Sequence, residues 1–284
     1  SSRLSRARQN ASAGGGVRTY VEAISTQLQR AGHDVTVFSP DSGQWREWFG
    51  ERGLRTVQRV DELPTEIDWF LSQDQPTALD LLDARPSVPQ AFVCHGIVYD
   101  VDMAPQLDDV IKVVFTFYGP PATRVHATSV RPPIIQLRQP INLSRFSPQG
   151  PISERPRRAV AISNYLVGKR RQILIDACKE AGIELELFGV NESRSTLAPE
   201  HEINSADIVF GKARVTAEAM ACGRAAYVYD AFGCDGWVTP ENLETLVATG
   251  FNGSATTYTA DAERLAADLA SYDPAMGQVN RDLA

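Results

Sequence analysis

Short apolar segments of strand length alternate with helical segments along most of the chain. An amphipathic stretch comes first, in which apolar residues recur every three or four positions from Val17 to Ala31. Strand-length runs then follow at 34–40, 56–60, 68–73, 90–96, 112–117 and 133–138. Runs that are apolar on both faces and alternate with helices are typical of parallel sheets covered on both sides. The alternation therefore predicts an α/β fold.

The alternation starts again after a polar, proline-rich segment. Residues 146–158, FSPQGPISERPRR, have the composition of a linker. Beyond this segment we expect strands at 159–163, 183–190 and 225–230 and helices at 169–181, at 213–222 and from about residue 261. A chain of 284 residues exceeds the usual size of one core. We predict two Rossmann-like, doubly wound parallel-sheet domains, residues 1–147 and 148–284, that face each other across a cleft.

Charge and hydropathy favour a soluble protein. The formal net charge of −7 argues against a surface that binds nucleic acid or an anionic membrane. No run approaches the roughly 18 apolar residues of a transmembrane segment, and the start of the sequence has arginines but no apolar signal region. We expect a cytoplasmic protein. Its four cysteines show no C-x-x-C pairing, which argues against a structural zinc site and a disulfide framework.

A glycine-rich loop precedes the first amphipathic helix. Gly15 and Gly16 allow the backbone to approach an anion closely, and the N-terminus of the helix from Val17 would offer N–H groups to a phosphate. A plain flexible turn explains these glycines equally well. Residues 1–13 do not have the pattern of the buried strand that should lead into such a loop, so the first strand is either missing or unrecognisable.

The segment ADIVFGKARVTAEAMACGRAAYVYD, residues 206–230, contains a second group of candidates. Lys212 and the N-terminus of the predicted helix can hold a diphosphate, and the Glu218 carboxylate can accept two hydrogen bonds from a ribose. Arg214 lies four residues before Glu218 on this helix. The alternative interpretation is therefore an exposed ion pair, worth roughly 0.3–0.5 kcal/mol.

Three segments resemble retaining GT-B glycosyltransferases of the GT4-like group. They are GGGVRTYVEAISTQLQRAGHDVTVFSP (14–40), QPINLSRFSP (139–148) and SADIVFGKARVTAEAMACGRAAYVYD (205–230). The resemblance implies transfer of a sugar from a UDP- or GDP-linked donor, with retention and without a metal or other cofactor. It also implies that the donor binds in the C-terminal domain. The acceptor, a glycan, a lipid or a small molecule, would bind mainly in the N-terminal domain.

The resemblance assigns donor-binding roles to four residues. Glu218 has the position of the second glutamate of the family's E-x7-E motif, which binds the donor ribose. Lys169 has the position of the lysine that clamps the diphosphate. Lys212 and Arg214 are the candidates for the remaining cation of this clamp.

In the N-terminal half the resemblance points to a catalytic histidine and to the glycine loop. His95, in VCHG, matches the histidine that lies beside the transferred sugar. Gly15 and Gly16 match the loop that approaches the donor phosphates and the acceptor.

The sequence departs from the family pattern at two places. Phe210 stands where the family has the first glutamate of its motif, and Ser163 and Asn164 replace the Gly-Arg of the diphosphate clamp. A strand-helix unit is shortened to residues 191–204, and the usual C-terminal crossing helix is not evident. Two alternatives stay open: a paralogue that binds nucleotides or glycans with weakened catalysis, and a sugar-nucleotide epimerase.

Other residues have a structural and a chemical interpretation. Asp100 and Asp102 form a D-x-D, which in another glycosyltransferase fold holds a metal ion, but a solvated acidic loop explains them better. Cys94 precedes His95 on a strand, where neighbouring side chains point to opposite faces, so a buried cysteine is favoured over a nucleophile. Trp237 can stack on a sugar or a base, or simply pack.

Overall fold

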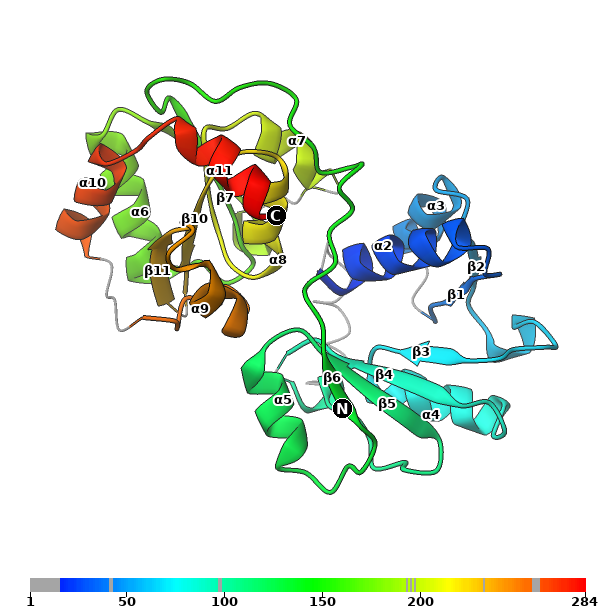
Figure 1. The fold of residues 1–284 in the computed structure, drawn as a ribbon. Coiled ribbons are helices and arrows are strands. Elements are labelled where there is room, and N and C mark those ends of the chain that lie inside the picture. Colours follow the sequence, from blue (N-terminus) through cyan, green and yellow to red (C-terminus); the bar gives the residue numbers. More distant parts are fainter. Residues whose placement is uncertain are drawn as a thin grey trace. The chain divides into compact units, whose positions relative to one another are not determined.

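The computed structural model describes residues 16–40, 43–96, 99–192, 194, 196, 198–231, 233–256 and 261–284. In these residues the chain forms two compact units, one that ends at Pro140 and one that spans Ile141–Ala284. Each unit combines helices with mostly parallel strands, as the sequence predicts (Figure 1). The division lies at Pro140 and not at residue 147, because Phe146 is fully buried in the core of the C-terminal unit.

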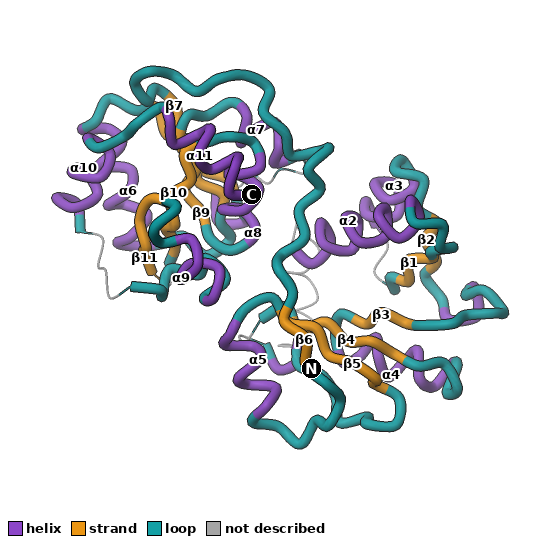
Figure 2. Tube along the Cα trace, in the orientation of Figure 1, coloured by secondary structure: helices purple, strands orange, loops and turns teal. Residues whose placement is uncertain are grey.

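The N-terminal unit contains two parallel sheets (Figure 2). One pairs β1 (Thr36–Phe38) with β2 (Arg55–Val57). The other has the order β3 (Phe70–Ser72), β4 (Gln90–Cys94), β5 (Ile111–Thr116) and β6 (Ile134–Gln136). All six strands overlap the six predicted runs. The segment before Gly16, in which the sequence shows no strand pattern and which includes Gly15, lies outside the described residues.

Helices and short 3₁₀ turns connect these strands. They are α2 (Gly16–Arg30), α3 (Gly43–Gly50), η1 (Val60–Glu62), α4 (Gln75–Ala84), η2 (Asp100–Asp102) and α5 (Gly119–His126). The predicted amphipathic helix is α2, which buries Tyr20 and Ala23. It ends at Arg30, and the φ of +92° at Gly32 in the turn that follows lets His33 donate its N–H to the carbonyl of Leu28 at 3.0 Å.

The C-terminal unit has one sheet of five strands. Its order is β11 (Gly233–Trp237), β10 (Ala225–Asp230), β9 (Ile208–Gly211), β7 (Arg158–Ile162) and β8 (Glu184–Phe188). The strands are parallel except β11, which runs antiparallel to β10. The strands predicted at 159–163, 183–190 and 225–230 are confirmed as β7, β8 and β10. The sequence patterns did not predict β9 or β11 as strands.

Helices cover both faces of this sheet (Figure 1). One face packs against α6 (Gly168–Glu180) and α10 (Ala262–Ala270), and the other against α7 (Pro199–Asn204), α8 (Arg214–Ala221) and α9 (Leu243–Ala248). The helix α11 (Ala275–Leu283) lies beside α8 and β10. Alternate residues along each strand point to opposite faces of the sheet and pack into the hydrophobic core on that face. Phe210 packs in the core that contains α6, and Val209 in the core that contains α8. Among the described helices, none is long and apolar enough to cross a membrane.

The segment predicted as a linker is part of the C-terminal unit. Asp207, just before β9, accepts backbone hydrogen bonds from Ser153, Arg157 and Arg158 at 2.7, 2.8 and 3.1 Å. Burial alone would raise the pKa of Asp207, but these hydrogen bonds outweigh it and hold the pKa below its usual value. Residues 146–158 therefore do not form a linker between the units, because this carboxylate and the buried Phe146 fix them to the sheet.

Candidate functional site

The carboxyl ends of three neighbouring C-terminal strands bring polar side chains together. From β7 the chain moves to β8 on one side, and then to β9 and β10 on the other. The order in which strands are added to the sheet thus changes side between β7 and β9, although these two strands are parallel. In sheets of this kind, ligands bind beyond the carboxyl ends of the strands at this point. Ser163 follows β7, Lys212 follows β9, and Asp230 ends β10. We call Ser163, Tyr165, Lys212 and Asp230 the switch-point cluster.

Asp230 is the buried anion of this cluster, with an exposed fraction of 1%. Its Oδ1 accepts hydrogen bonds from Ser163 Oγ at 2.9 Å and from the Ala231 N–H at 2.5 Å. Its Oδ2 lies 3.5 Å from Lys212 Nζ. Burial of a carboxylate costs free energy unless the charge is paired and hydrogen-bonded. The three neighbours therefore compensate for the burial of the Asp230 carboxylate.

Lys212 is the cation of the cluster. Its Nζ lies 4.4 Å from the centroid of the Tyr165 ring, which is the geometry of a cation–π contact. Burial lowers the pKa of Lys212, and the charge of Asp230 opposes this effect. The side chain keeps an exposed fraction of 22%. Its ammonium group is thus held by the protein and still open to an anionic ligand from solvent.

Ser163 and Asn164 organise the loops at this edge. The Ser163 hydroxyl also accepts the backbone N–H groups of residues 165 and 166 at 2.9 and 3.0 Å. Asn164 Oδ1 accepts the N–H of Val190, and its backbone carbonyl accepts Asn191 Nδ2, which joins the loops after β7 and β8. A Cβ on Gly189 would come within 2.0 Å of the Ser163 carbonyl oxygen, so only glycine fits there. These two residues fix the loops and supply no cation.

The remaining predicted phosphate-binding residues are at helix starts. Lys169 is exposed in the first turn of α6, and this helix follows β7, so its N-terminus lies at the same edge of the sheet. Gly16 is the first residue of α2 in the N-terminal unit. Gly15 lies outside the described residues. The phosphate-binding roles of these three residues stay predictions.

The predicted pair of Arg214 and Glu218 exists on α8, but it is buried. Arg214 Nε donates to Glu218 Oε1 at 2.7 Å, and the exposed fractions of the two side chains are 8% and 4%. Burial raises the pKa of Glu218, and the charges of Arg214 and Arg145 oppose this effect. Arg145 in turn forms an ion pair with Glu200 at 2.8 Å. The interpretation of an exposed ion pair is therefore wrong, because both side chains are buried. The estimate of a weak pair fails with it, since breaking a buried ion pair costs far more free energy than breaking an exposed one.

The residue before α8 has a backbone conformation that favours glycine. Ala213 has φ +49° and ψ −120°, and its N–H donates to the carbonyl of Phe251 at 2.8 Å. A side chain in such a conformation costs about 1–3 kcal/mol, and strain of this kind is concentrated at ligand-binding sites. The strained residue lies directly between Lys212 and Arg214.

Ala213→Gly is expected to raise the free energy of unfolding by about 1 kcal/mol, because the relieved strain exceeds the roughly 0.5–1 kcal/mol of extra backbone entropy that glycine loses on folding. Urea unfolding measures this change. Ala217→Gly, inside α8, is the matched control and should lower the free energy by about 1 kcal/mol. A loss for Ala213→Gly as large as that of the control would show that Ala213 is not strained.

His95 lies where the sequence predicts it, directly beyond β4 in the N-terminal unit. Its Nε2 is 2.6 Å from Oε1 of Gln73, which follows β3. The rings of Tyr20 and Phe117 lie against the imidazole, with centroid distances of 5.0 and 5.5 Å. Burial raises the pKa of Tyr20 to about 12, so its hydroxyl stays protonated. Neighbours from α2 and from the ends of β3 and β5 thus fix the half-buried imidazole.

The two aspartates of the D-x-D segment have different surroundings. Asp100 is exposed and forms an ion pair with Arg124. Asp102 is half-buried, and burial together with the charge of Asp74 raises its pKa to about 6. The expectation of a solvated acidic loop is therefore correct for Asp100 and wrong for Asp102, which is half-buried.

Cys94 and Trp237 have structural environments. All four cysteines are buried, and burial raises the pKa of the Cys94 thiol to about 11, which leaves little thiolate at neutral pH. Trp237 packs edge-on against Tyr227 with a centroid distance of 4.9 Å and donates its Nε1–H to the carbonyl of Asp268. These contacts favour packing over a nucleophilic or stacking role.

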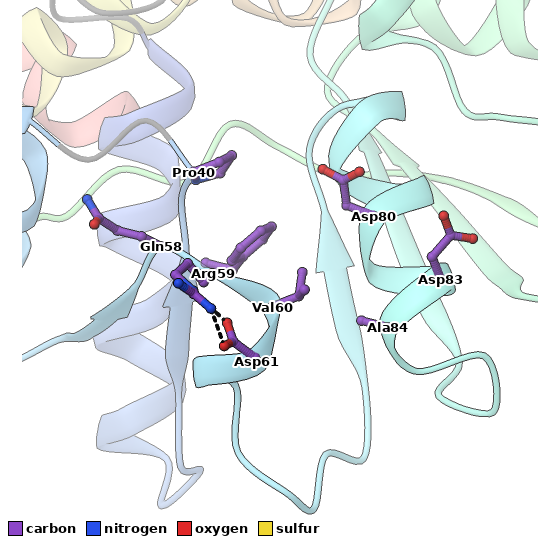
Figure 3. Close-up of a pocket in the computed structure, with 9 residues that line it drawn as sticks. Pro40, Gln58, Arg59, Val60, Asp61, Asp80, Asp83 and Ala84 are labelled. Atoms are coloured by element: carbon purple, nitrogen blue, oxygen red, sulfur yellow. Dashed lines mark hydrogen bonds and ion pairs between the residues drawn. The ribbon is translucent and has the colours of Figure 1, made fainter.

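A surface pocket of about 660 Å³ lies elsewhere in the N-terminal unit (Figure 3). Arg59 and Asp61 form a double hydrogen bond on one side, and Asp80 and Asp83 of α4 lie on the other. The pocket contains none of the predicted site residues. Its carboxylates disfavour an anionic ligand, because like charges repel.

Three residues of the switch-point cluster were not predicted as site residues: Ser163, Tyr165 and Asp230. Each lies at or just after the end of a predicted strand, and this position was the available signal. The strand order that joins them to Lys212 is visible only in the structure.

No protein-family model matches the chain, and no curated protein matches it in sequence. The structure is similar to that of Anabaena HepE in complex with UDP-glucose, with a TM-score of 0.59 and 12% identity over 91% of this chain and 95% of that chain. HepE in complex with UDP and glucose gives a TM-score of 0.58 and 12% identity, over 90% of this chain and 95% of that chain.

The chain has the GT-B fold. The similarity to HepE extends over both units, which confirms the predicted α/β class with two Rossmann-like units. At 12% identity it is a similarity of fold. MurG of Acinetobacter baumannii is a more distant match, with a TM-score of 0.46 and 14% identity over 96% of this chain and 93% of that chain.

Proposed function

We propose that the chain transfers a sugar from a nucleotide diphosphate sugar to an acceptor hydroxyl, with retention and without a metal ion. The switch-point cluster carries this proposal, because it holds the Lys212 ammonium at the ligand-binding edge of a parallel sheet. A cation at this edge suits phosphate groups. The shared fold adds support, since HepE was solved with UDP-glucose.

The donor would bind along the C-terminal edge. Lys212 and Lys169 would neutralise the diphosphate, helped by the N-terminus of α6. Glu218 would accept hydrogen bonds from the ribose, and Arg214 would hold its carboxylate in position. The loop at Gly15 and Gly16 would approach the donor phosphates. UDP- and GDP-linked sugars both fit these contacts, since none of the proposed contacts involves the nucleotide base.

Catalysis would rest on positioning and electrostatics. The bond between the anomeric carbon and the phosphate oxygen breaks, and the cations stabilise the departing nucleoside diphosphate. The acceptor oxygen forms its bond to the anomeric carbon from the same face and passes its proton to the departing phosphate oxygen. His95 would act beside the transferred sugar. This scheme requires no protein nucleophile. The acceptor would be a glycan, a lipid or a small molecule.

A binding protein with weakened catalysis is the second candidate, and Phe210 favours it. Phe210 is fully buried and packs against Tyr227 and Tyr229, with centroid distances of 5.3 and 6.3 Å. No carboxylate therefore reaches the donor sugar from this position. The same residue weakens the case for an epimerase, which needs carboxylates near the sugar.

Calorimetric titration with UDP- and GDP-sugars, followed by assays of nucleotide release, separates these functions. A transferase binds one donor and releases nucleotide faster when a suitable acceptor is present. A binding protein binds without turnover. An epimerase acts on the donor without any acceptor.

Lys169→Ala is expected to weaken nucleoside diphosphate binding by roughly 1.5–3 kcal/mol, the size of a charge-assisted hydrogen bond, and to leave nucleoside binding unchanged. Lys179→Ala, in the last turn of the same helix, is the matched control and should change neither affinity. Calorimetry with UDP and uridine measures both. Equal losses for the two ligands would remove Lys169 from the phosphate site.

A further inference from the structure

The Lys212 ammonium is held by contacts from the ends of two neighbouring strands. Lys212 itself follows β9, Asp230 belongs to β10, and Tyr165 lies in the loop after β7. Ser163, also after β7, donates to Asp230, so the anion is fixed from the neighbouring loop as well as by the Ala231 N–H. Such a set of contacts restricts the position of a side chain that is normally flexible.

We propose that Asp230 is a positioning residue for the diphosphate site: fixed by Ser163 and Ala231, it holds the Lys212 ammonium above Tyr165, where Lys212 receives the phosphates of a nucleoside diphosphate. This inference rests on the proposed function for the identity of the ligand. It assigns to Lys212 the cationic role that Ser163 and Asn164 do not supply after β7.

The geometry leaves the ammonium able to hold two anions at once. An ammonium group has three N–H donors, and Asp230 Oδ2 approaches from one direction at 3.5 Å, on the buried side. The Tyr165 ring covers another direction. The side chain still has an exposed fraction of 22%, and a phosphate oxygen can approach through this opening. The charge of Asp230 is offset by the Lys212 ammonium with which it is paired, which reduces its repulsion of the phosphates.

Asp230 also keeps the ammonium charged. Burial lowers the pKa of Lys212, and Asp230 is the charged neighbour that raises it again. Among the described residues, the titratable groups on the surrounding elements include the Tyr165 phenol and, in the first turn of α6, Lys169, Arg170 and Arg171. Arg171 is paired with Glu192, and Arg214 with Glu218 on α8, so within each pair the charges offset each other. Removal of the Asp230 charge should therefore lower the pKa of Lys212 further. Phosphate binding would then be lost at a lower pH.

The first test is the pH dependence of UDP and GDP binding between pH 7 and pH 10 in the full chain. Asp230→Asn keeps an oxygen that can accept from Ser163 and Ala231 but removes the charge. We expect wild-type affinity to fall at alkaline pH, and the fall to begin about one unit lower or more in Asp230→Asn. Lys212→Arg should move the start of this fall to higher pH, because arginine does not deprotonate in this range. The ligand's own ionisation is common to all variants.

Two results would overturn the inference. One is an identical alkaline fall in wild type and Asp230→Asn. The other is an alkaline fall that begins at the same pH in Lys212→Arg as in wild type. This variant needs no change at Asp230 and so remains informative if Asp230→Asn does not fold.

The second test needs no ligand. The chain has four lysines, at positions 112, 169, 179 and 212, so the acylation rate of each can be followed by mass spectrometry as a function of pH. The profile of Lys212 should move to lower pH in Asp230→Asn, while those of the exposed Lys169 and Lys179 stay in place as internal references. An unchanged Lys212 profile contradicts the coupling. If the profile moves but wild type binds no nucleoside diphosphate, the coupling stands and the proposed function fails.

Discussion

Arg214→Met is expected to lower the free energy of unfolding of the C-terminal unit by about 3–5 kcal/mol. The guanidinium of Arg214 donates to Glu218 Oε1 at 2.7 Å inside the protein, and its removal leaves a carboxylate with an exposed fraction of 4% without this partner. Such a carboxylate must either take up a proton or stay charged at a high cost in free energy. Urea unfolding followed by circular dichroism measures the change.

Two controls separate burial from charge. Arg264 and Asp268 form the same i, i+4 pair on α10, but the Arg264 side chain has an exposed fraction of 60%, so Arg264→Met should cost less than about 1 kcal/mol. The double variant Arg214→Met/Glu218→Leu replaces the buried pair by apolar groups and should recover most of the lost stability. If Arg214→Met costs no more than Arg264→Met, the pair is not buried in solution.

His95→Ala is expected to lower kcat by about 100-fold or more and to leave nucleotide affinity within about a factor of three. The imidazole is fixed by Gln73 and by the rings of Tyr20 and Phe117, which is the arrangement required of a group that acts in the transition state. It lies at the carboxyl end of β4, where parallel sheets present functional side chains. Steady-state kinetics and UDP titration measure the two effects.

A structural role for His95 predicts a different result. In that case His95→Ala would lower the melting temperature, and activity and nucleotide affinity would fall in proportion to the loss of folded protein. Gln73→Glu provides a further check, because it keeps an acceptor near Nε2 but stabilises the imidazolium, and it should shift the pH profile of kcat without loss of stability.

Most strand positions were predictable because short apolar or alternating runs bounded by turn residues are typical of strands. β7, β8 and β10 lie at the predicted positions, and His95 follows β4 as expected. The strand β9 was missed because its four residues, IVFG, are too few to separate from the helix that follows. β11 is rich in glycine and contains an aspartate, so it has no strand pattern at all.

The candidate site was predictable only in part, because pairs of residues depend on strand order. The sequence identified Lys212 and Glu218, but the contact of Lys212 with Asp230 requires β9 and β10 to be neighbours, and its contact with Tyr165 requires β9 to lie beside β7. The burial of the Arg214–Glu218 pair was also missed, because it depends on tertiary packing. Their spacing is that of an exposed pair, and only the packing of α8 against the sheet places them inside.

The most direct measurement of the central claim is a calorimetric titration of wild-type protein with UDP, GDP and the corresponding nucleosides. The account predicts that at least one nucleoside diphosphate binds, and that it binds about tenfold or more tightly than its nucleoside, because each charge-assisted contact to phosphate adds roughly 1.5–3 kcal/mol. A folded protein that binds neither diphosphate, or that binds a diphosphate no better than its nucleoside, would contradict it.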